Sequence, residues 1–446
     1  MTARETIAAI ATAAGRGGIG IVRVSGTGLD AIIRGVIGRP LSSRIAQRAD
    51  FLDAQRAVID QGIALYFPAP ASYTGEDVLE LQGHGGPVVL REILNRCVAL
   101  GARLARPGEF TERAFLNGKL DLAQAESVAD LIDATTAAAA RSALRSLQGA
   151  FSEEIESLSR AVLELRMLVE ATLDFPEEEI DALSQAELKG QLAAVSDRLE
   201  RVFEAARQGS FLRAGIHVVL VGQPNVGKSS LLNRLAGEDL AIVTDVPGTT
   251  RDLIRQSINL EGVPAHVIDT AGLRKSKDPV ELAGMSRAWS AIEKGDVVVV
   301  LMDARQGEGA EDRDILERLP GRLPCLRVMN KIDLLVDGSP RESMERGRTI
   351  WLSAKTGAGV DLLRHAILDS VGWQADGEAL YMARERHLEA LSAVRSHLNR
   401  AATQLPSLEL LAEDLRLAQE SLGTITGQVT SEDLLGQIFS RFCIGK

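Results

Sequence analysis

The sequence predicts a chain that combines α/β and all-α parts: an N-terminal α/β domain, then a helical domain into which a P-loop α/β domain is inserted. Three observations predict this fold class. Strand-like runs and turns fill roughly the first 118 residues, and helix-forming segments lie on both sides of a second α/β region. In that region an apolar run, 216–221, leads through a glycine-rich turn, 222–229, into a helical segment. This order of strand, turn and helix is typical of a phosphate-binding P-loop.

Composition excludes several classes of protein. The 446 residues suggest about three domains, and 45% apolar with 25% charged residues is ordinary for a globular protein. A net charge of −11 argues against a dedicated nucleic-acid coat protein. Any contact with RNA would therefore be made by a local patch of the surface or through a partner protein. No apolar run approaches the roughly 18 residues of a membrane span. Three widely spaced cysteines without a zinc pattern, and no targeting segment at the N-terminus, predict a cytoplasmic protein.

Residues 1–118 form the first predicted domain. The alternating run 19–24 predicts a strand, and runs 63–67 and 78–82 predict two more. Pro87 opens a predicted helix that reaches Leu100, because proline suits the first turn of a helix. A loop at 107–111 then leads into a short helix.

Helices dominate the segments 119–210 and 376–446. From 120 to 175 the sequence is almost unbroken helix former, with an apolar stripe at steps of three and four residues. Further helices are predicted at 185–207, 381–405, 408–422 and from Ser431. We favour one helical domain with 211–375 inserted, because helices end just before Ile216 and resume after Trp373. The alternative is two separate helical modules.

The inserted segment carries four nucleotide-binding motifs in order. The P-loop reads G-Q-P-N-V-G-K-S, in which Lys228 suits the β- and γ-phosphates and Ser229 suits magnesium. Asp269 and Gly272 end the next apolar run, where they suit magnesium-bound water and the γ-phosphate. Asp333 of N-K-I-D can accept hydrogen bonds from guanine N1–H and the 2-amino group, which adenine lacks. The predicted GTP-contacting residues here are Asn225, Val226, Gly227, Lys228, Ser229, Ser230, Asp269, Thr270, Ala271, Gly272, Asn330, Lys331, Asp333, Ser353, Ala354 and Lys355.

Two features differ from Ras-like switches. Leu273 stands where those proteins place a water-orienting glutamine, so hydrolysis needs another group such as Arg274, Asp278 or Glu281. Glu281 is either that group or a solvated acid at a helix start. Asn225 either ligates a monovalent cation beside the phosphates or stabilises a turn. The segment 244–252 can supply further oxygens, and its Thr250 is the natural second magnesium ligand.

Longer segments carry a family resemblance. They are G-R-G-G-I-G-I-V-R at 15–23, S-Y-T-G-E-D-V-L-E-L-Q-G-H-G-G at 72–86, R-P-G-E-F-T-E-R-A-F-L-N-G-K-L-D-L-A-Q-A-E at 106–126, G-Q-P-N-V-G-K-S-S, V-P-G-T-T-R-D, D-T-A-G-L-R and the terminal F-C-I-G-K. Through them the chain resembles the bacterial tRNA modification GTPase family MnmE, or TrmE, over essentially its whole length.

The resemblance implies a GTPase whose two GTP-binding domains pair in a potassium-dependent way. With a flavin-dependent partner, MnmG, such proteins install an aminomethyl-type group on C5 of the wobble uridine of certain tRNAs. It also implies a homodimer, formed through an N-terminal domain that binds 5-formyl- or methylene-tetrahydrofolate as one-carbon source.

The same resemblance implies roles for single residues. The implied GTP contacts of the switch are Thr244, Asp245, Val246, Pro247, Gly248, Thr249 and Thr250. Potassium ligands are implied at Asn225, Thr244, Val246 and Thr249, and magnesium ligands at Ser229 and Thr250. Glu281 and Arg274 are the implied catalytic residues. Arg23, Glu80, Lys119 and Lys446 are the implied folate ligands, and Cys443 is a possible contributor.

Other interpretations stay open at this point. The folate-site residues can equally be surface ion pairs at strand ends. A GTP-regulated RNA or ribosome assembly factor would need its own RNA-binding module, and none is found. The arginines at 384, 386, 395 and 400 are either a basic patch or a solvated helix face. The sequence does not distinguish the tRNA-modifying GTPase from a folate-dependent methyltransferase with a regulatory GTPase domain.

Overall fold

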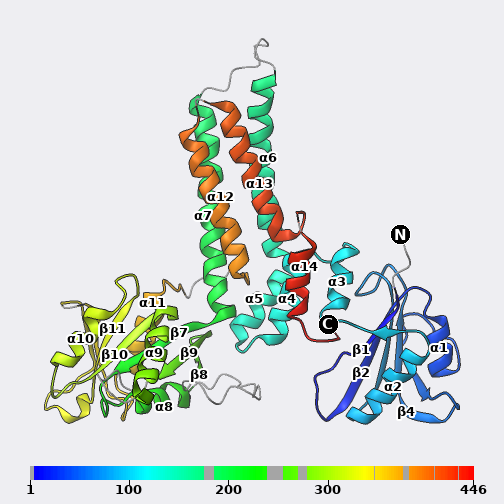
Figure 1. The fold of residues 1–446 in the computed structure, drawn as a ribbon, viewed down its shortest axis with the longest axis horizontal. Helices are drawn as coiled ribbons and strands as arrows, with labels where there is room; N and C mark the ends of the chain where they lie inside the picture. Colours follow the sequence, from blue (N-terminus) through cyan, green and yellow to red (C-terminus); the bar gives the residue numbers. More distant parts are fainter. Residues whose placement is uncertain are drawn as a thin grey trace. The chain divides into compact units, whose positions relative to one another are not determined.

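The computed structural model describes residues 5–174, 185–238, 255–269, 279–345, 347–374, 381–405, 407–429 and 431–445. Its packing divides the chain into two compact units, each with one β-sheet (Figure 1). The first unit comprises Met1–Ala129, Leu147–Leu163 and Leu415–Lys446, and the second comprises Asp130–Ser146 and Glu164–Asp414.

The sheet of the first unit has six strands in the order β3-β4-β5-β2-β1-β6. All neighbouring pairs are antiparallel except β1 with β6. The strands are β1 (Ile7–Ile10), β2 (Gly17–Gly26), β3 (Gln47–Leu52), β4 (Val58–Phe67), β5 (Asp77–Gly85) and β6 (Arg103–Leu104). The three predicted strands lie within β2, β4 and β5, and helices α1 (Asp30–Ile37), α2 (Pro87–Ala99) and α3 (Glu109–Leu116) accompany them.

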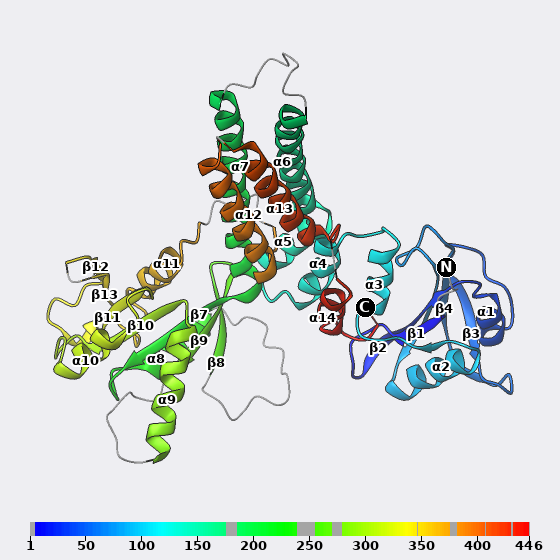
Figure 2. The same cartoon turned by 45° about the horizontal axis from the view of Figure 1, so that its top comes forward.

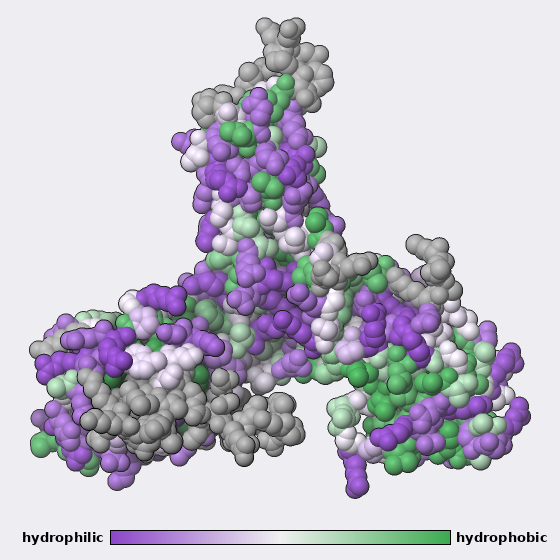
Figure 3. Space-filling model, viewed as in Figure 1, coloured by the Kyte–Doolittle hydropathy of each residue, from purple (hydrophilic) through white to green (hydrophobic). Residues whose placement is uncertain are grey.

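Alternation along the strands separates the two faces of this sheet. Val22 and Val24 of β2 are fully buried in the core that α1 and α2 cover. Arg23 lies between them in sequence and therefore points to the other face. Figure 3 shows hydrophobic side chains gathered on the visible side of this unit. Exposed apolar side chains of the unit include Ile19 of β2, Ile63 of β4 and Val88 of α2.

The sheet of the second unit has seven strands in the order β12-β13-β11-β10-β7-β9-β8. Its five inner strands are parallel, and the edge strands β12 and β8 are antiparallel to their neighbours. The strands are β7 (Ile216–Gly222), β8 (Arg255–Leu260), β9 (Val263–Asp269), β10 (Val297–Asp303), β11 (Cys325–Asn330), β12 (Arg341–Ser343) and β13 (Thr349–Trp351). The helices are α8 (Lys228–Glu238), α9 (Pro279–Lys294), α10 (Ala310–Arg318), the 3₁₀ turn η1 (Ile332–Leu334) and α11 (Val360–Ser370).

Both faces of this sheet are buried, as expected for parallel strands covered by helices. Val219 and Val298 pack with residues of α9 and α10, whereas Val218 and Val299 pack with residues of α8 and α11. The strand period of two thus sends neighbouring residues into two separate cores.

The remaining helices are α4 (Leu122–Asp133), α5 (Ala137–Leu147), α6 (Ala150–Asp174), α7 (Gln185–Ala214), α12 (Glu385–Thr403), α13 (Leu408–Thr426) and α14 (Glu432–Ser440). Helix α7, which precedes the P-loop sheet, lies alongside α12, which follows it (Figures 1 and 2). The Arg395 guanidinium of α12 lies 4.5 Å from the ring centre of Phe203 in α7. Helices before and after the insertion therefore form one assembly, and the alternative of two separate helical modules is wrong.

Two breaks divide the helical stretch that was predicted over 120–175. Thr136 starts a new helix, since its Oγ1 accepts a hydrogen bond from the Ala139 N–H at 3.1 Å. A second turn, at Gly149, separates α5 from α6. Within the described residues, no helix is long and apolar enough to cross a membrane.

Candidate functional site

The P-loop connects β7 to α8 at the carboxyl edge of the second sheet. At Gly227 the backbone is left-handed (φ 102°), and a Cβ there would lie 2.4 Å from the Asn330 side-chain nitrogen. Only glycine therefore fits against Asn330 at this point of the turn. Asn225 is also left-handed, with φ 63°, a conformation that asparagine tolerates better than most residues.

Two residues of the N-K-I-D motif hold this loop from β11. Asn330 is buried; its side-chain nitrogen donates to the Val226 carbonyl at 2.8 Å, and its oxygen accepts from the Ala354 N–H at 2.9 Å. Lys331 Nζ donates to the Asn225 carbonyl at 2.6 Å. Three motifs far apart in sequence thus meet at one edge, where ligands of α/β sheets bind.

Asp303, at the end of β10, is a contributor that the sequence analysis missed. Its buried carboxylate accepts from Lys331 Nζ at 2.9 Å and from Arg305 Nη2 at 2.6 Å. The Arg305 and Lys331 contacts hold the pKa of this carboxyl far below its ordinary value. Asp303 therefore fixes the lysine that fixes the P-loop. A single aspartate at a strand end carries no signal that could have shown this.

The charged groups that are predicted to face the phosphates and magnesium are partly desolvated. Burial lowers the pKa of Lys228, whose Nζ donates to the Gly222 carbonyl at 2.8 Å, and raises the pKa of Asp269. Ser229 Oγ lies 3.4 Å from Asp269 Oδ2, while the buried Oδ1 has no hydrogen-bond partner among the described residues. A hydroxyl and a carboxylate with a spare buried oxygen fit magnesium, a hard cation that prefers oxygen ligands.

The loop after β13 carries the residues that the sequence predicts to contact the guanine base. Ser353 Oγ donates to Asp333 Oδ1 at 2.5 Å, which orients the predicted guanine-reading carboxylate. The Lys355 carbonyl accepts from Arg234 Nη2 of α8 at 2.6 Å. The described residues Asn225 to Ser230, Asp269, Asn330, Lys331, Asp333 and 353–355 are therefore gathered along one edge of the sheet.

Several predicted site residues lie outside the described residues. They are Thr244, Asp245, Val246, Pro247, Gly248, Thr249, Thr250, Thr270, Ala271, Gly272, Arg274, Asp278 and Lys446. Glu281 falls within α9, but its side chain is not among those described.

A second cluster of predicted residues lies on the first sheet. Arg23 of β2 and Glu80 of β5 occupy paired positions, and Arg23 Nε and Nη2 both donate to Glu80 Oε1, at 3.0 and 2.9 Å. The Arg23 guanidinium lies 5.5 Å from the ring centre of Tyr73 and 5.8 Å from that of Phe110. Tyr73 and Phe110 were missed, although both stand inside motifs that carried the resemblance. The Arg23–Glu80 pair can recognise charged or polar groups of a ligand, and the two aromatic rings beside it offer flat apolar surfaces.

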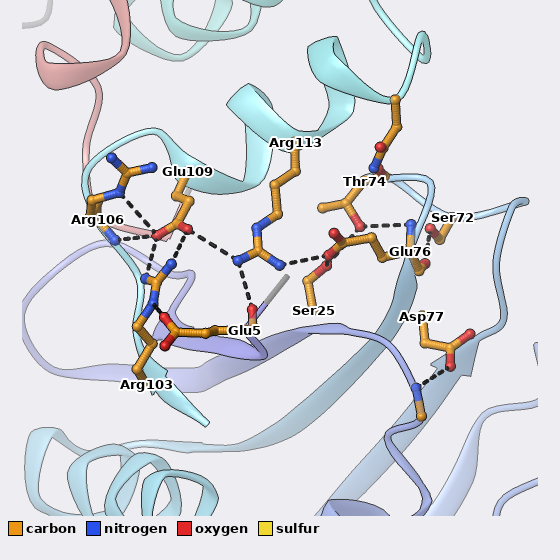
Figure 4. Close-up of polar contacts among 12 residues, drawn as sticks. Glu5, Ser25, Ser72, Thr74, Glu76, Asp77, Arg103, Arg106, Glu109 and Arg113 are labelled. Atoms are coloured by element: carbon orange, nitrogen blue, oxygen red, sulfur yellow. Dashed lines mark hydrogen bonds and ion pairs between the residues drawn. The ribbon is translucent and has the colours of Figure 1, made fainter. Parts of the chain in front are cut away.

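Helix α3 presents Phe110 and is held by a buried ionic network (Figure 4). Glu109 accepts from Arg103 at 2.6 Å and from Arg113 at 3.1 Å, and Arg113 also donates to Glu76 at 2.8 Å. Burial alone would raise the pKa of Glu109, but the hydrogen bonds from Arg103, the Arg106 backbone and Arg113 lower it to about 2. The network ties α3 to the turn before β5, and thereby fixes the aromatic side of the Arg23 cluster.

The C-terminal segment packs against the same helix. The Gly108 N–H donates to the Cys443 carbonyl at 3.4 Å, and at Gly445 a Cβ would lie 2.3 Å from the Ile10 carbonyl. Among the three cysteines, Cys443 is exposed and Cys97 is buried. Lys119 is exposed, and its Cγ lies 3.3 Å from where a Cβ on Gly75 would be. Thus the end of β1, α3 and the residues before 446 adjoin one another.

The arginines on and just before α12, which the sequence indicates as either a basic patch or a solvated helix face, are largely engaged in ion pairs. Arg384 pairs with Asp130 at 2.7 Å, Arg395 with Glu200 at 3.6 Å and Arg400 with Asp414 at 2.8 Å. These pairs link the arginines to neighbouring elements, which is evidence against a free basic patch.

Comparison with known proteins gives matches along the chain. The family model described as MnmE helical domain matches residues 122–443, and that described as GTP-binding protein TrmE N-terminus matches residues 6–119. The chain is 61% identical to the tRNA modification GTPase MnmE of Nitrosomonas europaea, with 100% of each chain covered. It is 59% identical to the protein of that name from Azoarcus sp., covering 99% of this chain and 98% of the other.

A solved structure of Aquifex aeolicus Era bound to GDP and aluminium fluoride also matches. It is 26% identical, covers 41% of this chain and 66% of its own, and has a TM-score of 0.29. That TM-score is too low to support a conclusion about this chain.

Proposed function

Because the chain belongs to the MnmE (TrmE) family of tRNA modification GTPases, we propose that it hydrolyses GTP as part of a tRNA modification reaction. One observation carries the nucleotide assignment: Asn330 joins the P-loop at Val226 to the base-binding loop at Ala354. Phosphate and guanine are then recognised on one rigid frame. We assign 211–375 to the GTPase domain, 119–210 and 376–446 to the helical domain, and 1–118 to the N-terminal domain.

Hydrolysis in this proposal needs no glutamine after Gly272. Ser229 and Asp269 would hold magnesium, with Thr250 as a further ligand, and magnesium would neutralise phosphate charge. Asn225, together with Thr244, Val246 and Thr249, would hold potassium, and potassium would add fixed positive charge beside the phosphates. Glu281 would orient the attacking water, and Arg274 would assist it. Of the potassium set, only Asn225 lies among the described residues, and its held left-handed turn supports this role.

Turnover of GTP in potassium against the same concentration of sodium tests the proposal. We expect potassium to accelerate turnover at least tenfold, and Asn225→Ala to remove that acceleration. Asn233→Ala is the matched control, since Asn233 is an exposed asparagine on α8 outside the loop. Equal, slow rates in both salts would mean that Asn225 only stabilises a turn, and a partner would then have to complete the site.

We further propose that the N-terminal domain binds 5-formyl- or methylene-tetrahydrofolate. Glu80 can accept hydrogen bonds from the donor edge of a pterin, and Arg23 and Lys119, with Lys446, suit the carboxylates of the glutamate tail. The rings of Tyr73 and Phe110 beside Arg23 support this assignment. The bound folate would supply the one-carbon unit, and Cys443 would lie on the segment that adjoins the site.

Equilibrium dialysis with 5-formyl-tetrahydrofolate tests the folate proposal. Glu80→Gln replaces one carboxylate oxygen by an NH2 donor and removes the negative charge, so the pair of acceptors that suits the pterin is lost and affinity is expected to fall at least tenfold. Asp60→Asn, which disrupts the His84 pair on neighbouring β4, is the control and should leave affinity unchanged. Equal affinity of wild type and Glu80→Gln would leave the Arg23–Glu80 contact as a structural ion pair.

The proposed reaction also needs partners. We propose a homodimer that forms through the N-terminal domain. This domain exposes the apolar side chains of Ile19, Ile63 and Val88, and a dimer interface would bury them. A flavin-dependent partner, MnmG, and tRNA would join it in the cytoplasm to modify C5 of the wobble uridine. Sedimentation of the chain alone and with the partner would give both masses; a monomer at micromolar concentration contradicts the dimer.

A further inference from the structure

The chain enters the P-loop sheet at the end of α7 and returns to the helices just before α12. Arginines at these two connections, called the crossings below, contact the same carboxylate, that of Asp130. Arg213 lies in the last turn of α7, three residues before the first sheet residue, Ile216, and Arg384 directly precedes α12. Arg213 Nε donates to Asp130 Oδ1 at 3.0 Å. Arg384 donates to the same carboxylate twice, from Nη2 at 2.7 Å and from Nε at 3.4 Å.

Asp130 sits where water screens its charge weakly. Its side chain is 8% exposed and that of Arg384 is 11% exposed. Attraction between charges grows as the surrounding dielectric constant falls. One carboxylate also separates two guanidinium groups here, so its removal would leave two like charges side by side. Asp130 thus holds both crossings together, and it does so from a third element, α4.

Hydrogen bonds between uncharged groups also hold the chain near the two crossings. The buried Gln208 of α7 donates to the Gly372 carbonyl at 2.6 Å and accepts from the Gln374 N–H at 3.2 Å. Ser146 Oγ of α5 accepts from the Met382 N–H at 2.7 Å. The outgoing chain is therefore attached to α7 before the crossing, and to α5 and α4 after it.

Helix α5 also contacts the sheet at a distance from the crossings. Thr136 Oγ1 donates to the Gly262 carbonyl at 2.7 Å, in the turn between β8 and β9. Strand β9 begins next to this turn and ends at Asp269, which faces Ser229 of the P-loop. The short segment 130–146 thus touches both crossings, and also the strand whose far end carries a nucleotide-site carboxylate.

We infer that Asp130 is a positioning residue that couples the nucleotide-dependent arrangement of the P-loop domain to the helices. With Asp130 in place, a displacement of β9 or of either crossing is passed to α4 and α5. Without its charge the P-loop domain still folds and turns over GTP, but its movements no longer reach the helices. This inference rests on the proposed function, because it presupposes that GTP turnover and tRNA modification are linked.

The test uses the full-length chain with tRNA, its flavin-dependent partner, GTP and the folate donor. Asp130→Asn keeps the size of the side chain and removes its charge. We expect GTP turnover within twofold of wild type and tRNA modification reduced at least tenfold. Asp133→Asn is the matched control, because Asp133 is exposed and lies one turn further along α4. It should change neither rate.

The ratio of the two rates separates coupling from a merely structural role. A structural defect would lower both rates together, so a proportional loss overturns the inference, as does unchanged modification. If Asp130→Asn fails to fold, Asp130→Glu keeps the charge at a shifted position and should give intermediate modification at normal turnover. Full modification in that variant would count against a requirement for this geometry.

If the wild-type protein modifies no tRNA, the proposed function is refuted but the role of Asp130 is not. Hydrogen exchange then tests the role of Asp130 directly. Exchange over 130–146 is compared between GDP and GDP with aluminium fluoride. Coupling predicts a nucleotide-dependent difference in wild type and Asp133→Asn that disappears in Asp130→Asn. Identical differences in all three proteins would overturn it.

Discussion

Asn330 shows how one side chain can set the shape of a phosphate loop. It is 2% exposed and bonds to Val226 on one side and Ala354 on the other. Its amide also occupies the place where a side chain at Gly227 would have to stand. The loop is therefore shaped by what lies beneath it as much as by its own backbone preferences.

A matched pair of glycine substitutions tests this view. Gly227→Ala should reduce GTP affinity at least tenfold, because a Cβ would collide with Asn330 in a left-handed backbone, and it should cost about 1–3 kcal/mol of stability. Gly237→Ala in α8 meets nothing within 4 Å, and should preserve affinity and add up to about 1 kcal/mol of helix stability. Titration with a fluorescent GDP and thermal unfolding would measure both effects. Normal affinity in Gly227→Ala would show that the Asn330 contact is dispensable.

Sequence motifs predicted a set of nucleotide-site residues, but not how these residues support one another. The N-K-I-D motif indicated Asn330 and Lys331 through their expected place at a strand end. Their hydrogen bonds to Val226 and Asn225 depend on the order of strands in the sheet, which no local pattern contains. The same limit applies to Asp303, whose partners are a lysine that directly follows the neighbouring strand β11 and an arginine two residues away.

At the scale of elements, the eight-residue helix α3 depends on its ionic network for position. Isolated helices of this length are marginal in water. Glu109 and Arg113, one turn apart and both buried, fix it to Arg103 and Glu76 (Figure 4). Because α3 carries Phe110 and contacts the C-terminal segment through Gly108, its position matters to the folate proposal.

The pH dependence of stability tests this network. The pKa of Glu109 is lowered to about 2 from an ordinary 4.5, so its contribution is fully present above about pH 4.5 and is lost as pH falls through about 2. Glu109→Gln should therefore lower the free energy of unfolding of the N-terminal unit by about 3 kcal/mol at pH 7, and flatten its dependence between pH 4.5 and 2. Urea unfolding with pulsed hydrogen exchange of β1 and β2 would measure this. Glu112→Gln, at the more exposed Arg106 pair, is the control; equal effects of both substitutions would refute the special role of Glu109.

Elements with clear periodicity were predicted, and short or interrupted ones were not. Strands β2, β4 and β5 alternate over nine or ten residues, whereas β6 has two residues and β1 four. Over 120–175 the composition favours helix throughout. The breaks come from the Thr136 hydroxyl, which caps a new helix, and from a turn at Gly149, both single-residue effects inside a uniform stretch.

At the scale of the whole molecule, chain order alone predicted that one domain is inserted in another. The contact of α7 with α12 confirms this prediction. How the insertion is attached could not be predicted, since Arg213 and Arg384 lie 83 and 254 residues along the chain from Asp130, the residue that both contact. No local pattern along the chain indicates that these three charges meet, because their contact depends on the fold.

The two helices that pack together, α7 and α12, are also synthesised at different times. Helix α7 ends at Ala214 and α12 begins at Glu385, so about 170 residues leave the ribosome between the two partners. At about 5–20 residues per second this takes roughly 10 to 30 seconds. The P-loop sheet itself is synthesised within this interval, while the side of α7 that packs against α12 still lacks its partner. Slow translation of this interval would lengthen the time for which that helix is exposed to chaperones and to aggregation, and it would delay completion of the nucleotide site as well.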